Sequence, residues 1–81
     1  MKEFLEYVAR GLVDKPDAVW VEVDDEGDET VLTLGVDQED MGRVIGREGR
    51  IANALRSLLK VMATKDGRHV ELEIVSDAEA D

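Results

Sequence analysis

The segment best suited to chemistry is a short glycine-containing stretch, Val44-Ile45-Gly46-Arg47-Glu48-Gly49-Arg50-Ile51. Two glycines separated by two residues let the backbone turn sharply and approach a ligand without an intervening Cβ. Arg47 and Arg50 add donors suited to phosphate oxygens. A helix is predicted to begin directly after this loop, so its unpaired amides and positive dipole end should point towards it. The pattern predicts a cradle for a phosphodiester backbone; a tight helix–helix turn without a ligand is the alternative.

Basic residues are concentrated around this loop. The chain has 10 Lys and Arg against 20 Asp and Glu, a net charge of -10, which by itself argues against a partner coated in phosphates. Residues 41–65, however, hold six basic residues and a single acid, Glu48, and so carry a charge of +5, whereas the remainder carries -15. A local basic stripe on an acidic body can hold one anionic ligand while the remaining surface repels others; an ordinary solvated helix face is the alternative.

Several function classes lack the residues they need. Cysteine is absent and His69 is the only histidine, so neither thiolate metal sites, a histidine-based zinc site nor a Ser-His-Asp triad is supported. A P-loop needs Gly-Lys-Ser/Thr where this chain has Gly49-Arg50-Ile51. No apolar run approaches the roughly 18 residues that span a bilayer, and the first ten residues do not look like an export signal. We therefore expect a soluble protein that is not an enzyme and has no cofactor and no membrane segment.

An acidic turn offers the one pattern that suggests a metal. Asp24, Glu26 and Asp28 alternate around it, but an EF-hand loop starting at Asp24 would need glycine where Glu29 stands and glutamate where Gly35 stands. We expect a solvated hairpin and no metal site.

The loop must be positioned by a small set of elements. Hydrophobic periodicity and turn signals predict one domain over residues 1–75 with a short acidic tail over 76–81. The expected elements are a helix over Lys2–Val13, strands over Ala18–Val23 and Thr30–Val36, a helix over Gln38–Val44 capped by Asp37, a helix over Arg50–Thr64 and a strand over Val70–Ile74. The helical pair is long enough to be a crossover that makes the second and third strands parallel. The fold class is α+β, in the order α-β-β-α-α-β, with three helices on one face of a three-stranded mixed sheet.

The apolar positions predict a single core. Its expected members are Val19, Val21, Leu32, Leu34, Leu55, Leu58, Leu59, Leu72 and Ile74. Val23 is expected on the same buried strand face as Val19 and Val21. Trp20 alternates with the buried valines and should lie on the opposite sheet face, where it could stack a base or anchor a partner. Packing against its neighbours is the alternative role.

In this setting the loop resembles the signature of the K-homology (KH) domain, in which a Gly-x-x-Gly loop joins two helices and clamps about four nucleotides. Ile45 before the loop and Ile51 after it fit the same pattern. The order of elements resembles the type II, bacterial form of that fold, and the chain to roughly Val75 is similar to the small stand-alone KH proteins of the KhpA family. This resemblance implies single-stranded RNA binding in the cytoplasm, often with a larger KH partner of the KhpB (Jag-like) family or as a homodimer. The family's complex is linked to RNA chaperoning or post-transcriptional regulation and to cell elongation or envelope homeostasis.

The resemblance also assigns roles to residues of the loop. Gly46 and Gly49 would let the sugar-phosphate backbone lie against the chain, and Arg47 and Arg50 would meet phosphates together with the helix amides. Arg43, on the preceding helix, would be a secondary contact.

Bases would then enter a groove floored by Ile45 and the strand Thr30–Val36. Glu48 departs from the pattern, because an acid in the middle of the loop opposes phosphate binding. Together with the net charge, Glu48 and Trp20 motivate an alternative function, a KH-shaped module for dimerisation or partner docking with weak or lost RNA binding.

Overall fold

Three strands form one mixed sheet with β2 at its centre. β1 (Trp20–Glu26) pairs antiparallel with β2 (Glu29–Val36), and β2 pairs in parallel with β3 (His69–Ser76). The computed structural model describes residues 1–76, and all structural statements below concern that part of the chain. β1 and β3 are thus both edge strands, each with one side open to other chains or ligands.

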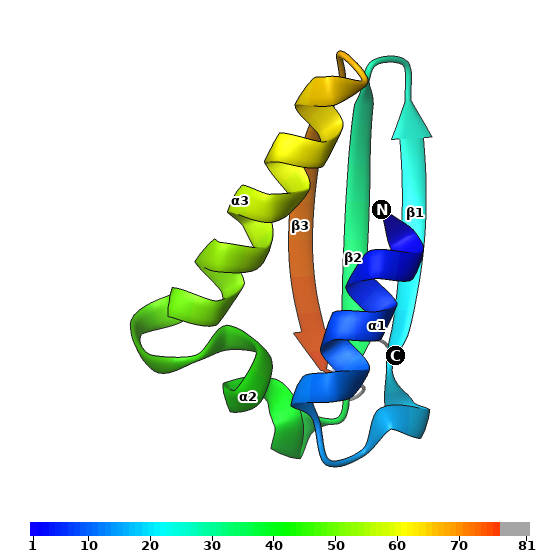
Figure 1. Ribbon diagram of the computed structural model, residues 1–81. Helices are drawn as coiled ribbons and strands as arrows, with labels where there is room; N and C mark the ends of the chain where they lie inside the picture. Colours follow the sequence, from blue (N-terminus) through cyan, green and yellow to red (C-terminus); the bar gives the residue numbers. More distant parts are fainter. Residues whose placement is uncertain (77–81) are drawn as a thin grey trace.

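All three helices lie on the same side of this sheet (Figure 1). α1 (Lys2–Leu12) packs along β1 and β2, α3 (Arg50–Lys65) packs along β3, and the short α2 (Met41–Ile45) lies at the lower end of the view. α2 and α3 form the crossover that a parallel β2–β3 pair requires. The predicted α+β class and element order are therefore confirmed, including the parallel pair.

Short 3₁₀ turns complete the connections. They span Pro16–Ala18, Gln38–Asp40 and Arg47–Gly49. The predicted helix over residues 38–44 is therefore split into a turn and α2, and Asp37 caps the turn by accepting a hydrogen bond from the Glu39 amide at 2.9 Å. β3 continues to Ser76, which is buried, while residues 77–81 of the expected tail lie outside the described part of the chain.

One hydrophobic core lies between the helices and the sheet. Its fully buried large side chains include Leu5 from α1, Leu32 and Leu34 from β2, and Leu59 from α3. Leu5 comes from α1 and Leu59 from α3, which lie side by side on the same face of the sheet, so one core holds both long helices against it. Burying each such side chain stabilises the fold by about 1.5–3 kcal/mol.

Two predictions of burial are wrong, those for Val23 on its strand face and Leu58 in the core. Val23 remains 42% exposed, since it faces the corner of the sheet beyond the start of α1. Leu58 is 51% exposed. The buried stripe of α3 follows Ala52, Leu55, Leu59 and Ala63, and Leu58 falls about 60° to one side of Leu55 on a helix with 3.6 residues per turn.

Candidate nucleic-acid interface

The two glycines of the loop have different physical requirements. Gly46 ends α2 with φ 77° and donates to the Gly42 carbonyl at 2.9 Å. A Cβ at Gly46 would lie 2.7 Å from Ile51 Cγ1 and 2.9 Å from the Ile51 amide nitrogen. Gly49 also has a positive φ, 76°, but a Cβ there would meet only Asn53 Nδ2, at 3.8 Å. Gly46 is therefore required by packing within the protein, because a side chain there would collide with Ile51. At Gly49 the space beside the start of α3 is open.

Glu48 occupies a strained position between them. With φ 57° and ψ 24°, it is the one non-glycine residue among residues 1–76 in the left-handed region. Its side chain is 75% exposed, and Oε2 lies 3.8 Å from Nη2 of Arg50. No side chain caps α3, whose N-cap is Gly49. The Arg50 amide donates to the Arg47 carbonyl within the preceding turn, and no side chain caps the amides that follow it in this 16-residue helix.

Positive charge without an acidic partner is concentrated on this side of the molecule. Half of the basic side chains form ion pairs, namely Arg10, Lys15, Arg43, Arg50 and Arg68. Among residues 1–76, the basic residues with no carboxylate within 4.0 Å are Lys2, Arg47, Arg56, Lys60 and Lys65. Four of these five belong to the loop or to α3, so the cations without an acidic partner are concentrated on these two elements.

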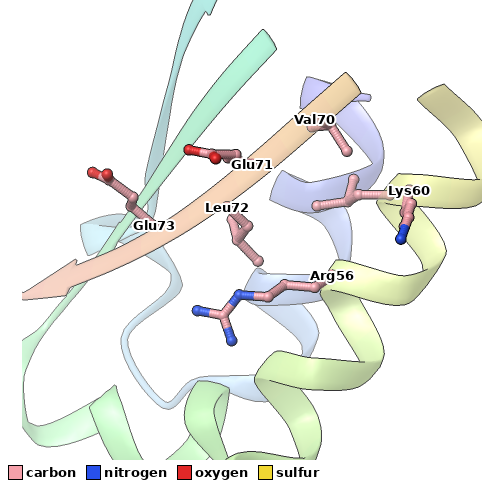
Figure 2. A pocket seen from close by; sticks show the side chains of 7 residues that line it. Arg56, Lys60, Val70, Glu71, Leu72 and Glu73 are labelled. Atoms are coloured by element: carbon pink, nitrogen blue, oxygen red, sulfur yellow. The ribbon is translucent and has the colours of Figure 1, made fainter. Parts of the chain in front are cut away.

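A groove continues from this helix to the edge of the sheet. A cavity of about 320 Å³ between α3 and β3 is lined by Arg56, Leu59, Lys60, Val70, Glu71, Leu72 and Glu73. Figure 2 shows Arg56 and Lys60 on the α3 wall and the side chains of Val70 and Leu72 turned towards α3. Glu71 and Glu73 project from the other side of β3. The groove therefore offers cations along the α3 wall, while the β3 wall combines the apolar Val70 and Leu72 with two glutamates.

The strand beside the groove differs from the predicted one. β3 lies next to α3, while β2 is central and turns Leu32, Leu34 and Val36 into the core. Ile45 is half-buried and packs against that core. Arg56 and Lys60 lie one turn apart on the polar face of α3, and this spacing in the sequence could have predicted the basic wall of the groove.

Comparison with known proteins agrees with this geometry. The family model described as "KhpA/KhpB, KH domain" matches residues 2–74. This chain belongs to the KhpA/KhpB KH-domain family. The chain is 47% identical to the RNA-binding protein KhpA of Halalkalibacterium halodurans, over 93% of this chain and 99% of the relative. It is also 47% identical to the RNA-binding protein KhpA of Borreliella burgdorferi, over 90% of this chain and 89% of the relative.

Solved structures show the same KH fold at lower identity. Aquifex aeolicus Era bound to GDP.AlF4- superposes with a TM-score of 0.54 at 22% identity, covering 93% of this chain and 29% of Era. Era in complex with MgGDPNP and nucleotides 1506–1542 of 16S ribosomal RNA gives a TM-score of 0.50. The KhpA relatives match over nearly their full length and the family is non-enzymatic, which confirms the expectation that this chain is not an enzyme.

Arg43 is engaged away from the KH loop. Its Nη2 lies 2.9 Å from Oδ2 of Asp14, and its Nε lies 3.3 Å from Oδ1 of Asp40. Asp40 is only 2% exposed and accepts hydrogen bonds from the amides of Asp14 and Lys15, both at 3.1 Å. This network joins α2 to the connection between α1 and β1. Arg43 therefore helps to hold the helix that carries the KH loop.

Lys15 belongs to the same corner. Its ammonium lies 3.0 Å from Glu39 and 3.6 Å from Asp37. The hydrogen bond to Glu39, with the nearby charge of Asp37, raises the pKa of Lys15 above its usual value. Lys15 thus stays charged and paired here, away from the cations of the KH loop and α3.

Trp20 is not brought near the KH loop. It begins β1, the edge strand on the other side of β2 from β3. The half-buried indole covers Gly35, its cross-strand neighbour, so closely that a Cβ at Gly35 would overlap the ring. Residues 1–76 contain no cluster of carboxylates or histidine that could hold a metal ion, and no helix among them could cross a membrane.

Proposed function

We propose that this chain binds single-stranded RNA along a track that starts at the Gly-x-x-Gly loop and follows the groove between α3 and β3. The observation that carries the proposal is the coincidence of uncapped α3 amides with unpaired cations at Arg47, Arg56 and Lys60. Relatives at 47% identity named as RNA-binding proteins support it. As in those relatives' family, a KH loop would clamp about four nucleotides.

The chemistry of each wall assigns a part of the nucleotide to it. Phosphates would meet the amides at the start of α3 and the guanidinium of Arg47, with Arg50 contributing once it leaves Glu48. The strand would then pass Arg56 and Lys60. Bases would pack on Val70 and Leu72 and present their edges to the open backbone edge of β3, where donors and acceptors allow modest sequence preference.

The charge of the remaining surface would confine RNA to this track. With a net charge of -10, the molecule as a whole repels nucleic acid, and only the loop and α3 are locally positive. Affinity should accordingly be modest and strongly salt-dependent. A cytoplasmic role as an RNA chaperone or post-transcriptional regulator, with a KhpB-like partner or as a homodimer, is the corresponding cellular proposal. Links to cell elongation or envelope homeostasis belong to the same proposal.

The test is a pair of charge-matched variants. Replacing Arg47 and Glu48 together by aspartate changes the net charge by -2 at the loop, and aspartate tolerates the left-handed conformation of position 48. Lys2→Asp makes the same change at an unpaired cation at the start of α1, away from the loop. Titration of a labelled eight-nucleotide single-stranded RNA at low and moderate salt should show at least about fivefold weaker binding for the loop variant.

The control variant should bind nearly as the unmodified chain does, and thermal unfolding should be nearly unchanged in both. Equal affinities for all three proteins would show that RNA does not bind at the loop. In that case, the alternative function, a KH-shaped module for dimerisation or partner docking, would better explain Glu48 and the acidic surface.

A further inference from the structure

One whole face of the sheet is covered by no helix of residues 1–76. We call it the outer face: the side of β1, β2 and β3 turned away from α1, α2 and α3 (Figure 1). Strand alternation and register place on it Trp20, Glu22, Asp24, Glu26, Glu29, Val31, Thr33, Gly35, His69, Glu71, Glu73 and Val75. No segment of residues 1–76 packs over these side chains. Parallel strand pairs are ordinarily covered on both faces, so the open side of the β2–β3 pair is unusual.

The central strand makes the outer face apolar along its middle. Val31 and Thr33 of β2 are half-buried there, as are Val75 of β3 and Trp20 of β1. Gly35 has no side chain, and the Trp20 indole lies across it. The face therefore presents a shallow apolar column aligned with β2, with Val31 and Thr33 half-buried and Gly35 buried beneath the Trp20 indole.

Acidic side chains flank this column on both sides. Glu22 of β1 and Glu73 of β3 are both register partners of Thr33, and Asp24 and Glu71 are both register partners of Val31. With neighbouring strands about 4.8 Å apart, the two acidic columns are about 10 Å apart, close to the diameter of an α-helix. No Lys or Arg lies on this face.

We propose that the outer face docks an amphipathic helix of a protein partner whose apolar stripe is flanked by Lys and Arg. The stripe would cover Val31 and Thr33, and the basic flanks would meet the carboxylates of β1 and β3. The same charges repel RNA, and they oppose a second copy of this face. The area is small, so the complex should be weak and transient. This proposal does not depend on RNA binding: Glu71 and Glu73 border both the groove and the outer face, but the cations proposed to hold RNA lie on the loop and α3, on the helical side of the sheet.

The only tryptophan of the chain, Trp20, reports directly on this face. The probe is a synthetic 18-residue helix of Leu and Lys at amphipathic spacing, without tryptophan, and the reference probe is oligolysine of equal length. We expect a saturable shift in Trp20 emission with the amphipathic peptide and at least about tenfold weaker binding of oligolysine. Calorimetry of the same mixtures gives a second measure of affinity.

Charge-matched variants locate the site. Glu22→Lys with Glu73→Lys should weaken peptide binding at least about tenfold, because four units of charge are changed beside the apolar column. Glu3→Lys with Asp17→Lys makes the same change in net charge at exposed positions of α1 and of the Pro16–Ala18 turn, outside the outer face, and should alter affinity by less than about twofold. The aspartate variant of the KH loop should bind the peptide normally. Equal losses in the two lysine variants, or equal affinities for the two probes, would overturn the proposal.

Discussion

Glu48 offers the sharpest test of whether nucleic acid passes over the loop. Its carboxylate projects from the middle of the Gly-x-x-Gly segment, and Oε2 lies 3.8 Å from Nη2 of Arg50, the first residue of α3. Glu48→Lys removes a repulsive charge, adds an attractive one and frees Arg50. We expect single-stranded RNA to bind more tightly as a result.

The size of the effect follows from Coulomb's law. One unit charge about 8 Å from a phosphate in water is worth roughly 0.5 kcal/mol, so a change of two units is worth roughly 1 kcal/mol. That corresponds to about fivefold tighter binding at low salt, rising towards tenfold when Arg50 is also released. A further cation on the track should steepen the dependence of log affinity on log salt by about 0.7.

The assay is a salt series of RNA titrations on three variants. Glu3→Lys gives the same change in net charge on α1 and serves as the control. Glu48→Gly removes the charge without adding one, and should therefore give about half the gain in binding free energy. Since glycine adopts the left-handed conformation without strain, Glu48→Gly should also raise the free energy of unfolding by about 1 kcal/mol. If Glu48→Lys and Glu3→Lys have equal affinities and equal salt slopes, the electrostatic reasoning about the loop fails.

Two further predictions concern how the loop is held. Gly46→Ala should destabilise the fold by roughly 1–2 kcal/mol more than Gly49→Ala in chemical denaturation, since both positions have a positive φ but only Gly46 lies against Ile51; equal losses would show that the Gly46–Ile51 contact is not restrictive. Asp40→Asn should cost about 2–3 kcal/mol, because the amide can no longer accept from both the Asp14 and Lys15 backbones while also pairing with Arg43. Urea unfolding checks this second prediction, with the exposed Asp17→Asn as a control that should leave the free energy of unfolding unchanged. A decrease of less than about 0.5 kcal/mol in the free energy of unfolding of Asp40→Asn would contradict it.

Local patterns in the sequence were enough to predict the elements and their order. Periods of 3.6 and 2 residues located α1, α3 and the three strands to within a few residues, because one face of each element must be apolar to pack. The position of the Gly-x-x-Gly loop could also be predicted from the sequence, since glycine is the residue that accepts the positive φ found at Gly46 and Gly49. The crossover length predicted that β2 and β3 run in parallel.

Only the tertiary structure decided which charges are available and which strand borders the groove. Arg43, expected from the sequence as a secondary contact, forms ion pairs with Asp14, 29 positions earlier in the chain, and with the buried Asp40. β3, which is last in the chain, became the edge beside α3 and took the place expected for β2. Ion pairing and strand order depend on contacts between residues distant in sequence, and such contacts leave no periodic signal in a single chain. Local sequence thus determined the loop and the elements that flank it, while packing determined which cations and which strand lie open beside it.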